Sequence, residues 1–121
     1  MTFGHGPGHV ARAVLEGLAL VVRHCLETVR ARPTELRVCG GGASSDPWTQ
    51  IISDVTGLPV LRSADAEAGA RGAYLIGARA LGLEARPVEA RDAFRPGADH
   101  DEQYERFTAL RRAVSATWGK Q

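Results

Sequence analysis

A run of three glycines, Gly40, Gly41 and Gly42, is the part of this sequence best suited to contact a ligand. Without a Cβ atom, glycines let backbone amides approach a bound group closely. Ser45 follows the run and precedes an Asp-Pro pair, a pattern typical of a helix with a serine cap and a proline in its first turn. Because a helix N-terminus favours oxygen-rich groups, the loop is a candidate nucleotide site. The run is neither GxxxxGK(S/T) nor GxGxxG, so a tight structural turn also explains it.

The histidines and cysteines do not suggest a second site. His5 and His9 are four residues apart, but the Gly-Pro-Gly between them argues against a helix that would pair them, and we predict no metal site. Cys25 and Cys39 lie in apolar stretches without the spacing of metal ligands. This pattern indicates reduced thiols rather than a disulfide.

The glycine loop must be held by the elements on either side of it. The apolar residues 36–39 predict a short strand that ends at the glycines. The helix capped by Ser45 is predicted to reach Thr56 and to end at Gly57. Ahead of both, residues 9–30 carry apolar side chains at steps of three and four, which predicts a long amphipathic helix. Its apolar side is wide, so we expect protein to cover most of it.

The chain after Gly57 predicts a second strand and a third helix. Residues 58–61 are compatible with a short strand, and Ser63 or Asp65 could cap a helix that runs to Leu81. Glycines recur in that helix at three- and four-residue steps, and each costs about 0.5–1 kcal/mol relative to alanine. We therefore expect another backbone to pack closely against this helix.

The remaining residues complete a single α/β domain over residues 1–121. Residues 83–98 contain two prolines and a glycine and predict a loop, and a last amphipathic helix is predicted over 99–118. With a core over 9–82, the expected order is helix, strand, helix, strand, helix, and then the C-terminal helix.

Length and charge exclude several classes of protein. The chain has 121 residues, 44% of them hydrophobic, which is enough for one modest domain but short for an enzyme of two lobes. A formal net charge of +1 gives no basic surface for a nucleic acid or a membrane. Because no apolar run approaches the ~20 residues of a membrane span, we expect a cytoplasmic protein without a membrane partner.

Four segments resemble the FGGY family of carbohydrate kinases, in the order and spacing of that family. They are RAVLEG at 12–17, GGGASSDPWTQ at 40–50, SDVTGLPV at 53–60 and EAGARGA at 67–73. Within that family, the sequence most resembles the xylulose kinases. It implies the C-terminal part of the second lobe of a ribonuclease-H-like, actin-like ATPase fold, a lobe that closes with a first lobe over sugar and ATP.

The resemblance also implies roles for the glycine loop. Gly41 and Gly42, with Gly40 ahead of them, belong to the loop that lies against the adenosine of ATP. Ser45 takes a position from which a family side chain reaches the adenine. Capping of the following helix is the alternative for Ser45, and the two roles are compatible. The glycines over 69–73 are expected to pack beneath the nucleotide cleft rather than to touch the ligand.

The catalytic parts of such a kinase are expected outside these residues. FGGY kinases hold a phosphate-binding Asp-Gly-Thr loop in the first lobe and an aspartate base ahead of the segment matched here, and neither pattern occurs in this sequence. We therefore assign no catalytic residue. ATP would be bound with Mg²⁺ held mainly by the missing part, and the sugar would be reached only through the missing lobe.

Two hypotheses follow for the whole chain. The first is an ATP-binding fragment or split subunit of a sugar or polyol kinase, inactive unless an N-terminal kinase part complements it. The second is a non-catalytic module that forms a homodimer through its exposed sheet edge, and a remnant without function is a third reading. In the family's lobe, further strands that this sequence lacks would normally cover the first helix and both predicted strands. We therefore expect exposed apolar surface there.

Overall fold

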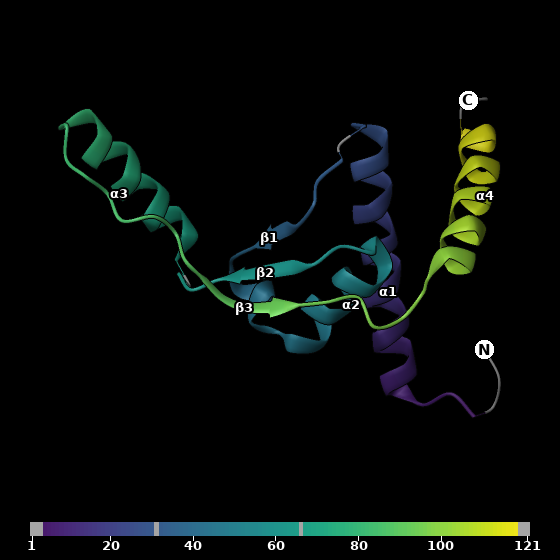
Figure 1. The fold of residues 1–121 in the computed structure, drawn as a ribbon. Helices are drawn as coiled ribbons and strands as arrows, with labels where there is room; N and C mark the ends of the chain where they lie inside the picture. Colours follow the sequence, from purple (N-terminus) through teal and green to yellow (C-terminus); the bar gives the residue numbers. More distant parts are fainter. Residues whose placement is uncertain (1–3, 31, 66, 119–121) are drawn as a thin grey trace.

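The computed structural model describes residues 4–30, 32–65 and 67–118, and it shows an α/β chain (Figure 1). Its elements are α1 (Pro7–Thr28), β1 (Leu36–Val38), the 3₁₀ helix η1 (Gly41–Ser44), α2 (Asp46–Thr56), β2 (Val60–Ser63), α3 (Ala68–Ala80), β3 (Ala90–Phe94) and α4 (Asp101–Trp118). The predicted order of helices and strands is confirmed, with η1 and β3 added to it.

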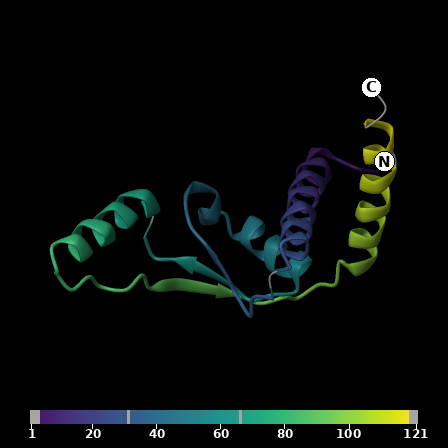
Figure 2. The same cartoon turned by 90° about the horizontal axis from the view of Figure 1, so that it is seen from above.

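The three strands form one sheet in the order β1-β2-β3. β1 and β2 are parallel, with Leu36 opposite Val60, whereas β3 is antiparallel to β2 and places Asp92 opposite Arg62. Seen from above, α1 and α2 lie on one side of the strands, and α3 and α4 lie at opposite ends of the molecule (Figure 2). The two parallel strands therefore both lead toward the end of the molecule where α3 lies.

The core lies between the sheet and the helices α1 and α2. Buried side chains of α1, α2, β2 and α4 form one apolar cluster, whose members are Ala19, Leu20, Ile51, Ile52, Val55, Val60 and Tyr104. Val55 and Val60 are completely buried. Because residues two apart in a strand share a face, Val60 and Arg62 both point toward α2. The small core is thus built around α2, the helix that follows the glycine loop.

Part of the predicted loop over 83–98 is a strand, so that prediction is wrong for Ala90–Phe94. The sequence ARDAF has neither the β-branched residues nor the apolar alternation that indicate a strand. It forms because β2 offers a free edge, and a register irregularity at Arg62 and Ser63 accommodates the pairing. Long-range pairing, and not local preference, creates this element.

Two predicted helix starts also differ from the structure. α1 begins at Pro7, within the segment where a helix was not expected, because proline suits the first turn and the Gly6 amide donates to Nδ1 of His9 at 3.2 Å. α3 begins at Ala68, after Glu67, so neither Ser63 nor Asp65 caps it. The Ser63 hydroxyl instead accepts a hydrogen bond from the Asp65 amide at 3.1 Å, which closes a local turn.

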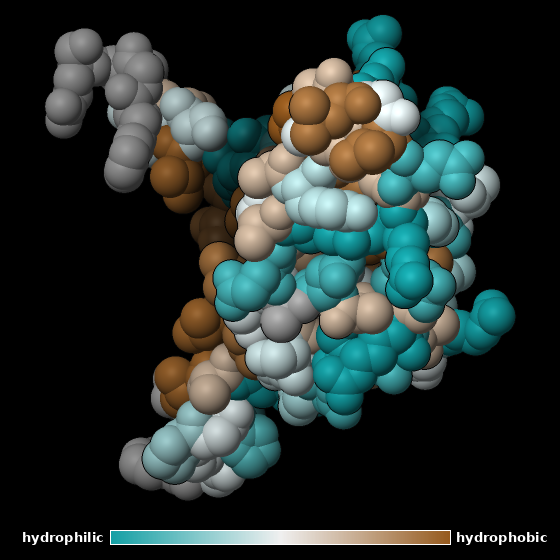
Figure 3. Space-filling model, turned by 90° about the vertical axis from the view of Figure 1, so that its left-hand side faces the viewer, coloured by the Kyte–Doolittle hydropathy of each residue, from teal (hydrophilic) through white to brown (hydrophobic). Residues whose placement is uncertain are grey.

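α1 exposes an apolar surface, as expected, but it is covered much less than its sequence suggested. Its exposed apolar side chains, called the α1 stripe below, are Val10, Val14, Leu18 and Val21, with exposures of 45% to 58%. Figure 3 shows apolar surface along the edge that α1 forms. Ala19 and Leu20 are the only buried residues of this helix. Nothing in the described part of the chain covers the α1 stripe.

Within the described residues, no helix is both long and apolar enough to cross a membrane.

Candidate functional site

The glycine loop forms a tight turn that leads from β1 into η1. Gly40 has φ +85° and ψ 179°, a backbone conformation that residues with a side chain rarely adopt. The Gly40 carbonyl accepts a hydrogen bond from the Ala43 amide at 3.0 Å, and the Gly42 carbonyl accepts one from the Ser45 amide at 3.2 Å. The Ser44 hydroxyl donates to the Gly41 carbonyl at 2.6 Å. Hydrogen bonds among its own residues, 40–45, therefore stabilise the loop.

The outer side of the glycine loop is open. Gly40, Gly41 and Gly42 are all exposed. A Cβ atom added to Gly41 would meet no other atom within 4 Å, and one added to Gly42 would only touch the Trp48 indole at 3.7 Å. The bend is thus not buried against its own chain, and a ligand can approach its backbone without displacing side chains.

Ser45 caps α2, which confirms the structural role predicted for it. Its hydroxyl accepts a hydrogen bond from the Trp48 amide at 3.4 Å, and its carbonyl accepts from both the amide and the hydroxyl of Thr49, each at 3.0 Å. Ser45 is exposed, whereas Thr49 is completely buried. The Ser45 side chain therefore lies at the surface beside the glycines, and its predicted contact with a ligand stays a prediction.

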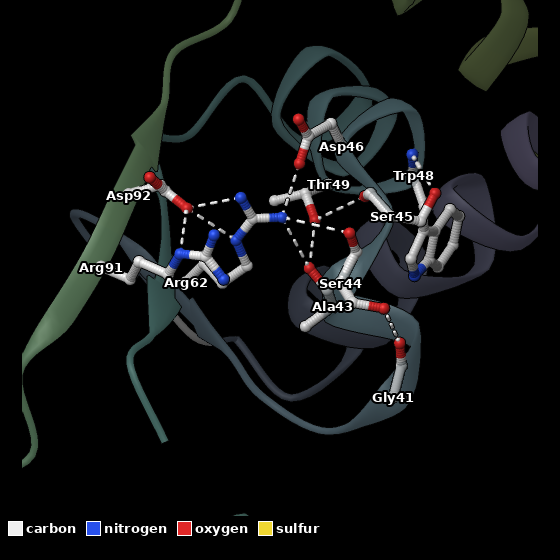
Figure 4. Close-up of polar contacts among 10 residues, drawn as sticks. All are labelled: Gly41, Ala43, Ser44, Ser45, Asp46, Trp48, Thr49, Arg62, Arg91 and Asp92. Carbon is white, nitrogen blue, oxygen red and sulfur yellow. Dashed lines mark hydrogen bonds and ion pairs between the residues drawn. The ribbon is translucent and has the colours of Figure 1, made fainter. Parts of the chain in front are cut away.

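Arg62 of β2 lies behind the loop and was not predicted as part of the site. Its Nη1 donates to the Ala43 carbonyl at 3.1 Å and to Oδ1 of Asp46 at 2.6 Å (Figure 4). Its Nε donates to Oδ2 of Asp92 at 2.9 Å, and its Nη2 bonds the same oxygen. The arginine is 8% exposed. One buried guanidinium thus joins the loop, the start of α2 and the strand β3.

The surroundings of Arg62 favour its charged form. The hydrogen bond that Arg62 donates to Asp92 raises the pKa of the guanidinium, and the one that it donates to Asp46 raises this pKa further. The guanidinium carbon also lies 5.1 Å from the centre of the Phe94 ring, a distance at which cation and aromatic face attract. Because a buried charge is tolerated only when it is paired, the two carboxylates make this position possible.

A signal for Arg62 was present in the sequence. Arg62 lies one residue beyond the predicted strand over 58–61 and two positions after the apolar Val60, so a charge there needs a partner on the same face if the strand continues. Asp46 lies at the predicted start of the helix ahead of this strand and was available as that partner. Asp92 could not have been found, because its strand carries no local pattern.

Gln50 and Asp54 lie on α2 behind the loop and bond the segment that follows β3. The Gln50 amide donates to Asp54 at 2.8 Å and to the Arg95 carbonyl at 2.8 Å. The Gly97 amide donates to the same Asp54 oxygen at 2.8 Å. These side chains therefore hold the segment after β3 against α2.

A cavity of about 220 Å³ lies next to the loop, at the ends of the two parallel strands. Its wall includes Val38 and Cys39, which lead into the glycines, and Ala68, Gly72 and Leu75 of α3. In sheets with parallel strands, ligands commonly bind at this end of the strands. The glycines themselves do not line the cavity, so the loop forms its neighbouring rim.

The close packing predicted for the α3 glycines is wrong for this chain. A Cβ atom added to Gly69, Gly72 or Gly77 would meet no atom within 4 Å. The described part of the chain supplies no backbone to pack against that helix. The conformational cost of these glycines is therefore not offset by contacts in the structure.

The charged residues of the chain do not form a metal site where the structure describes them. Across residues 4–30, 32–65 and 67–118, no three His, Cys, Asp or Glu side chains converge to hold an ion. We assign no step through a metal to these residues.

Comparison with known proteins gives a consistent result. Residues 1–81 match the sequence profile of the FGGY family of carbohydrate kinases, C-terminal domain. A glycerol kinase of Alkalilimnicola ehrlichii is 39% identical over 98% of this chain and 26% of that protein. An erythritol kinase of Brucella abortus is 32% identical over 92% of this chain and 24% of that protein. A xylulose kinase structure from Rhodospirillum rubrum superposes with a TM-score of 0.73 at 28% identity, over 97% of this chain and 26% of that one.

These matches place the glycine loop within the similar region. The loop falls inside residues 1–81, whereas β3 and α4 lie beyond them. The structural likeness confirms the predicted α/β, actin-like lobe. The chain spans about a quarter of the length of the curated relatives named above.

Proposed function

The chain belongs to the FGGY family of carbohydrate kinases as its C-terminal domain, and from this premise we propose that it binds the adenosine part of ATP with its glycine loop. One observation carries the proposal: the loop is open on its outer side and lies at the N-terminus of the capped helix α2. Amides at a helix N-terminus favour the oxygen-rich groups of a nucleotide.

The exposed residues of the loop have separate roles in this proposal. The backbone of Gly41 and Gly42 lies against the ribose and base, because no side chain there keeps a ligand away. The positive φ of Gly40 provides the turn that presents them. The Ser45 hydroxyl, which is exposed beside them, contacts the adenine while it also caps α2.

The chemical step is assigned to residues outside this chain. In a kinase of this family, the γ-phosphoryl group of ATP is transferred to a hydroxyl of the acceptor, and ADP leaves. Such a step needs groups that position the phosphates and a base near the acceptor hydroxyl. The relatives that match over most of this chain are glycerol and erythritol kinases, so we propose a small polyol or sugar as the acceptor. A cytoplasmic location is part of the same proposal.

A second candidate function is favoured by the α1 stripe. Exposed valines and a leucine on one helix are typical of an interface, and β1 has an unpaired edge in the described sheet. A non-catalytic module that forms a homodimer through these surfaces would need no nucleotide.

Calorimetry with ATP and a mixing assay separate the two functions. If the kinase proposal is right, the 121-residue chain binds ATP with a Kd of about 1 mM or below. Gly41→Val should remove that binding while it leaves the melting temperature unchanged, because the added side chain occupies only the open outer side of the loop. Mixing with the N-terminal part of a related glycerol kinase should restore polyol phosphorylation. A stable dimer that releases no heat with ATP would overturn the proposal.

A further inference from the structure

We propose that Arg62 is a positioning residue for the nucleotide loop, and that Asp92 of β3 holds it in place. The inference rests on the proposed function, because the loop it positions is the one assigned to adenosine. It goes further in two respects. It assigns a role to a buried charge behind the site, and it makes β3 part of the site although β3 lies beyond residues 1–81, which match the sequence profile of the family.

The first step of the argument is the direction of the Arg62 hydrogen bonds. Nη1 donates to two successive carbonyls of the loop, Ala43 at 3.1 Å and Ser44 at 3.4 Å. The same nitrogen bonds Asp46, the first residue of α2. Figure 4 shows the guanidinium between the loop and β3, with these groups converging on it from the loop side. The arginine thus contacts the loop from the side of the sheet, opposite the exposed outer side of the glycines.

The second step is that peptide groups are planar. A carbonyl and the amide of the following residue belong to one rigid plane and point in opposite directions. By holding the carbonyls of Ala43 and Ser44, Arg62 therefore fixes the directions of the Ser44 and Ser45 amides as well. These two peptide planes join the glycines to the α2 cap, so their orientation sets the shape of the surface offered to a nucleotide.

The third step is the anchoring of Arg62 itself. Asp92 lies directly opposite Arg62 in the β2–β3 register, and one of its oxygens binds both Nε and Nη2. A planar guanidinium held at two nitrogens cannot rotate about its own axis. Nη1 is then aimed at the loop. Asp92 acts through Arg62, and it has no contact of its own with the loop among the hydrogen bonds in Figure 4.

A lysine at this position would keep the charge but lose the geometry. The donors of an ammonium group all lie on one nitrogen atom, whereas the planar guanidinium bonds a carboxylate on one side and two carbonyls on the other. Arg62→Lys therefore separates positioning from simple charge pairing. Arg37→Lys is the matched control, because Arg37 lies on the neighbouring strand, its side chain is 63% exposed, and its partner among the described residues is Glu35.

The test uses the 121-residue chain with Trp118→Phe, so that Trp48 is the single tryptophan. Three quantities are measured for each variant: Trp48 emission, hydrogen exchange at the Ala43 and Ser45 amides, and the Kd for ATP. Trp48 reports on the loop because its indole lies beside Gly42. For Arg62→Lys we expect altered emission, exchange at these amides faster by about tenfold or more, and a Kd raised by about tenfold, while exchange within α1 stays unchanged.

Each outcome decides the inference. If Arg62→Lys exchanges its loop amides like the parent chain, Arg62 does not position the loop. If exchange rises but the Kd stays within about twofold, the loop is ordered by Arg62 without consequence for the nucleotide, and the inference also fails. If the parent chain binds no ATP, both the proposed function and the nucleotide part of the inference are wrong. The exchange data then still show whether Arg62 orders the loop.

A second variant covers the case in which Arg62→Lys does not fold. Asp92→Asn removes one charge at a side chain that is 39% exposed, so it disturbs the core less than a change of Arg62. We expect the same pattern of faster loop exchange and weaker ATP binding, at smaller amplitude. Loop exchange and ATP affinity equal to those of the parent chain would overturn the role assigned to Asp92 and to β3.

Discussion

The Tyr104 hydroxyl donates a hydrogen bond of 2.6 Å to the carboxylate of Glu27, and this bond attaches α4 to the end of α1. Arg23 lies over the same tyrosine ring at 4.2 Å, and its Nη1 bonds both the Val55 carbonyl at 3.1 Å and Asp101 at 2.7 Å. Three helices therefore meet at this pair. Tyr104 is a buried member of the core cluster, and Phe107 of the same helix packs against that cluster.

Alkaline pH should release α4. Burial, followed by the Glu27 bond, raises the pKa of Tyr104 from 10.0 to about 12. A raised pKa means that the folded state favours the neutral phenol, so this contribution to stability is complete below pH 10 and is lost as the pH rises through about 12. Urea unfolding from about pH 9 to about pH 12 should show the decline. Tyr104→Phe should remove this pH dependence, and an identical decline in that variant would contradict the assignment.

Gly40 should tolerate substitution far less than its neighbour. Gly40→Ala must adopt φ +85°, and the strain should cost about 1–3 kcal/mol of unfolding free energy. Gly41→Ala, in open space and without a positive φ, should stay within about 0.5 kcal/mol of the parent chain. Chemical denaturation of both variants measures the difference. Equal losses would mean that the turn at Gly40 does not depend on its backbone conformation.

Two substitutions at Ser45 should separate its two roles. Ser45→Ala removes the cap of α2 and should cost about 1 kcal/mol, whereas Ser45→Gly should cost only a few tenths. Both remove the hydroxyl assigned to the adenine. If that assignment is right, calorimetry shows weaker ATP binding in the glycine variant although its stability is nearly unchanged. Full ATP affinity in Ser45→Gly would leave capping as the one role of this side chain.

The α1 stripe should drive association of the isolated chain. Val14 is 58% exposed near the middle of the stripe, so Val14→Lys should leave the fold intact and shift the chain toward monomer in sedimentation velocity. Leu83→Lys is the control, since Leu83 is 61% exposed but lies beyond α3, outside the stripe. A parent chain that is already monomeric at tens of micromolar would contradict self-association.

Local signals in the sequence were enough for the elements that frame the loop. Ser45 and Gly57 delimit α2 as predicted, because a serine cap and a glycine with φ +70° act through their own neighbours. β3 and the bond between Arg62 and Asp92 could not be predicted in the same way. They depend on the pairing of segments about thirty residues apart, as between Arg62 and Asp92, and neither segment shows the pairing in its own pattern.

The apolar face predicted for α4 is covered only at the beginning of the helix. Tyr104 is buried and Phe107 packs against the core, but Leu110 and Val114 are 66% and 45% exposed. The sequence pattern gives the side of a helix that is apolar, and it does not say whether the chain supplies anything to cover that side. The same reasoning applies to the glycines of α3, which find no neighbour in the described residues.

The position of α3 has a consequence for how the molecule comes apart. This helix makes few contacts with the other elements, and its main link is Arg71, whose guanidinium bonds the Arg86 carbonyl and lies 3.5 Å from Asp65. Surface contacts of this kind are worth about 1 kcal/mol or less each. Detaching α3 should therefore require much less free energy than unfolding the core around Val55 and Val60. Proteases that cut after arginine should reach Arg71 and Arg79 in molecules whose sheet is still intact.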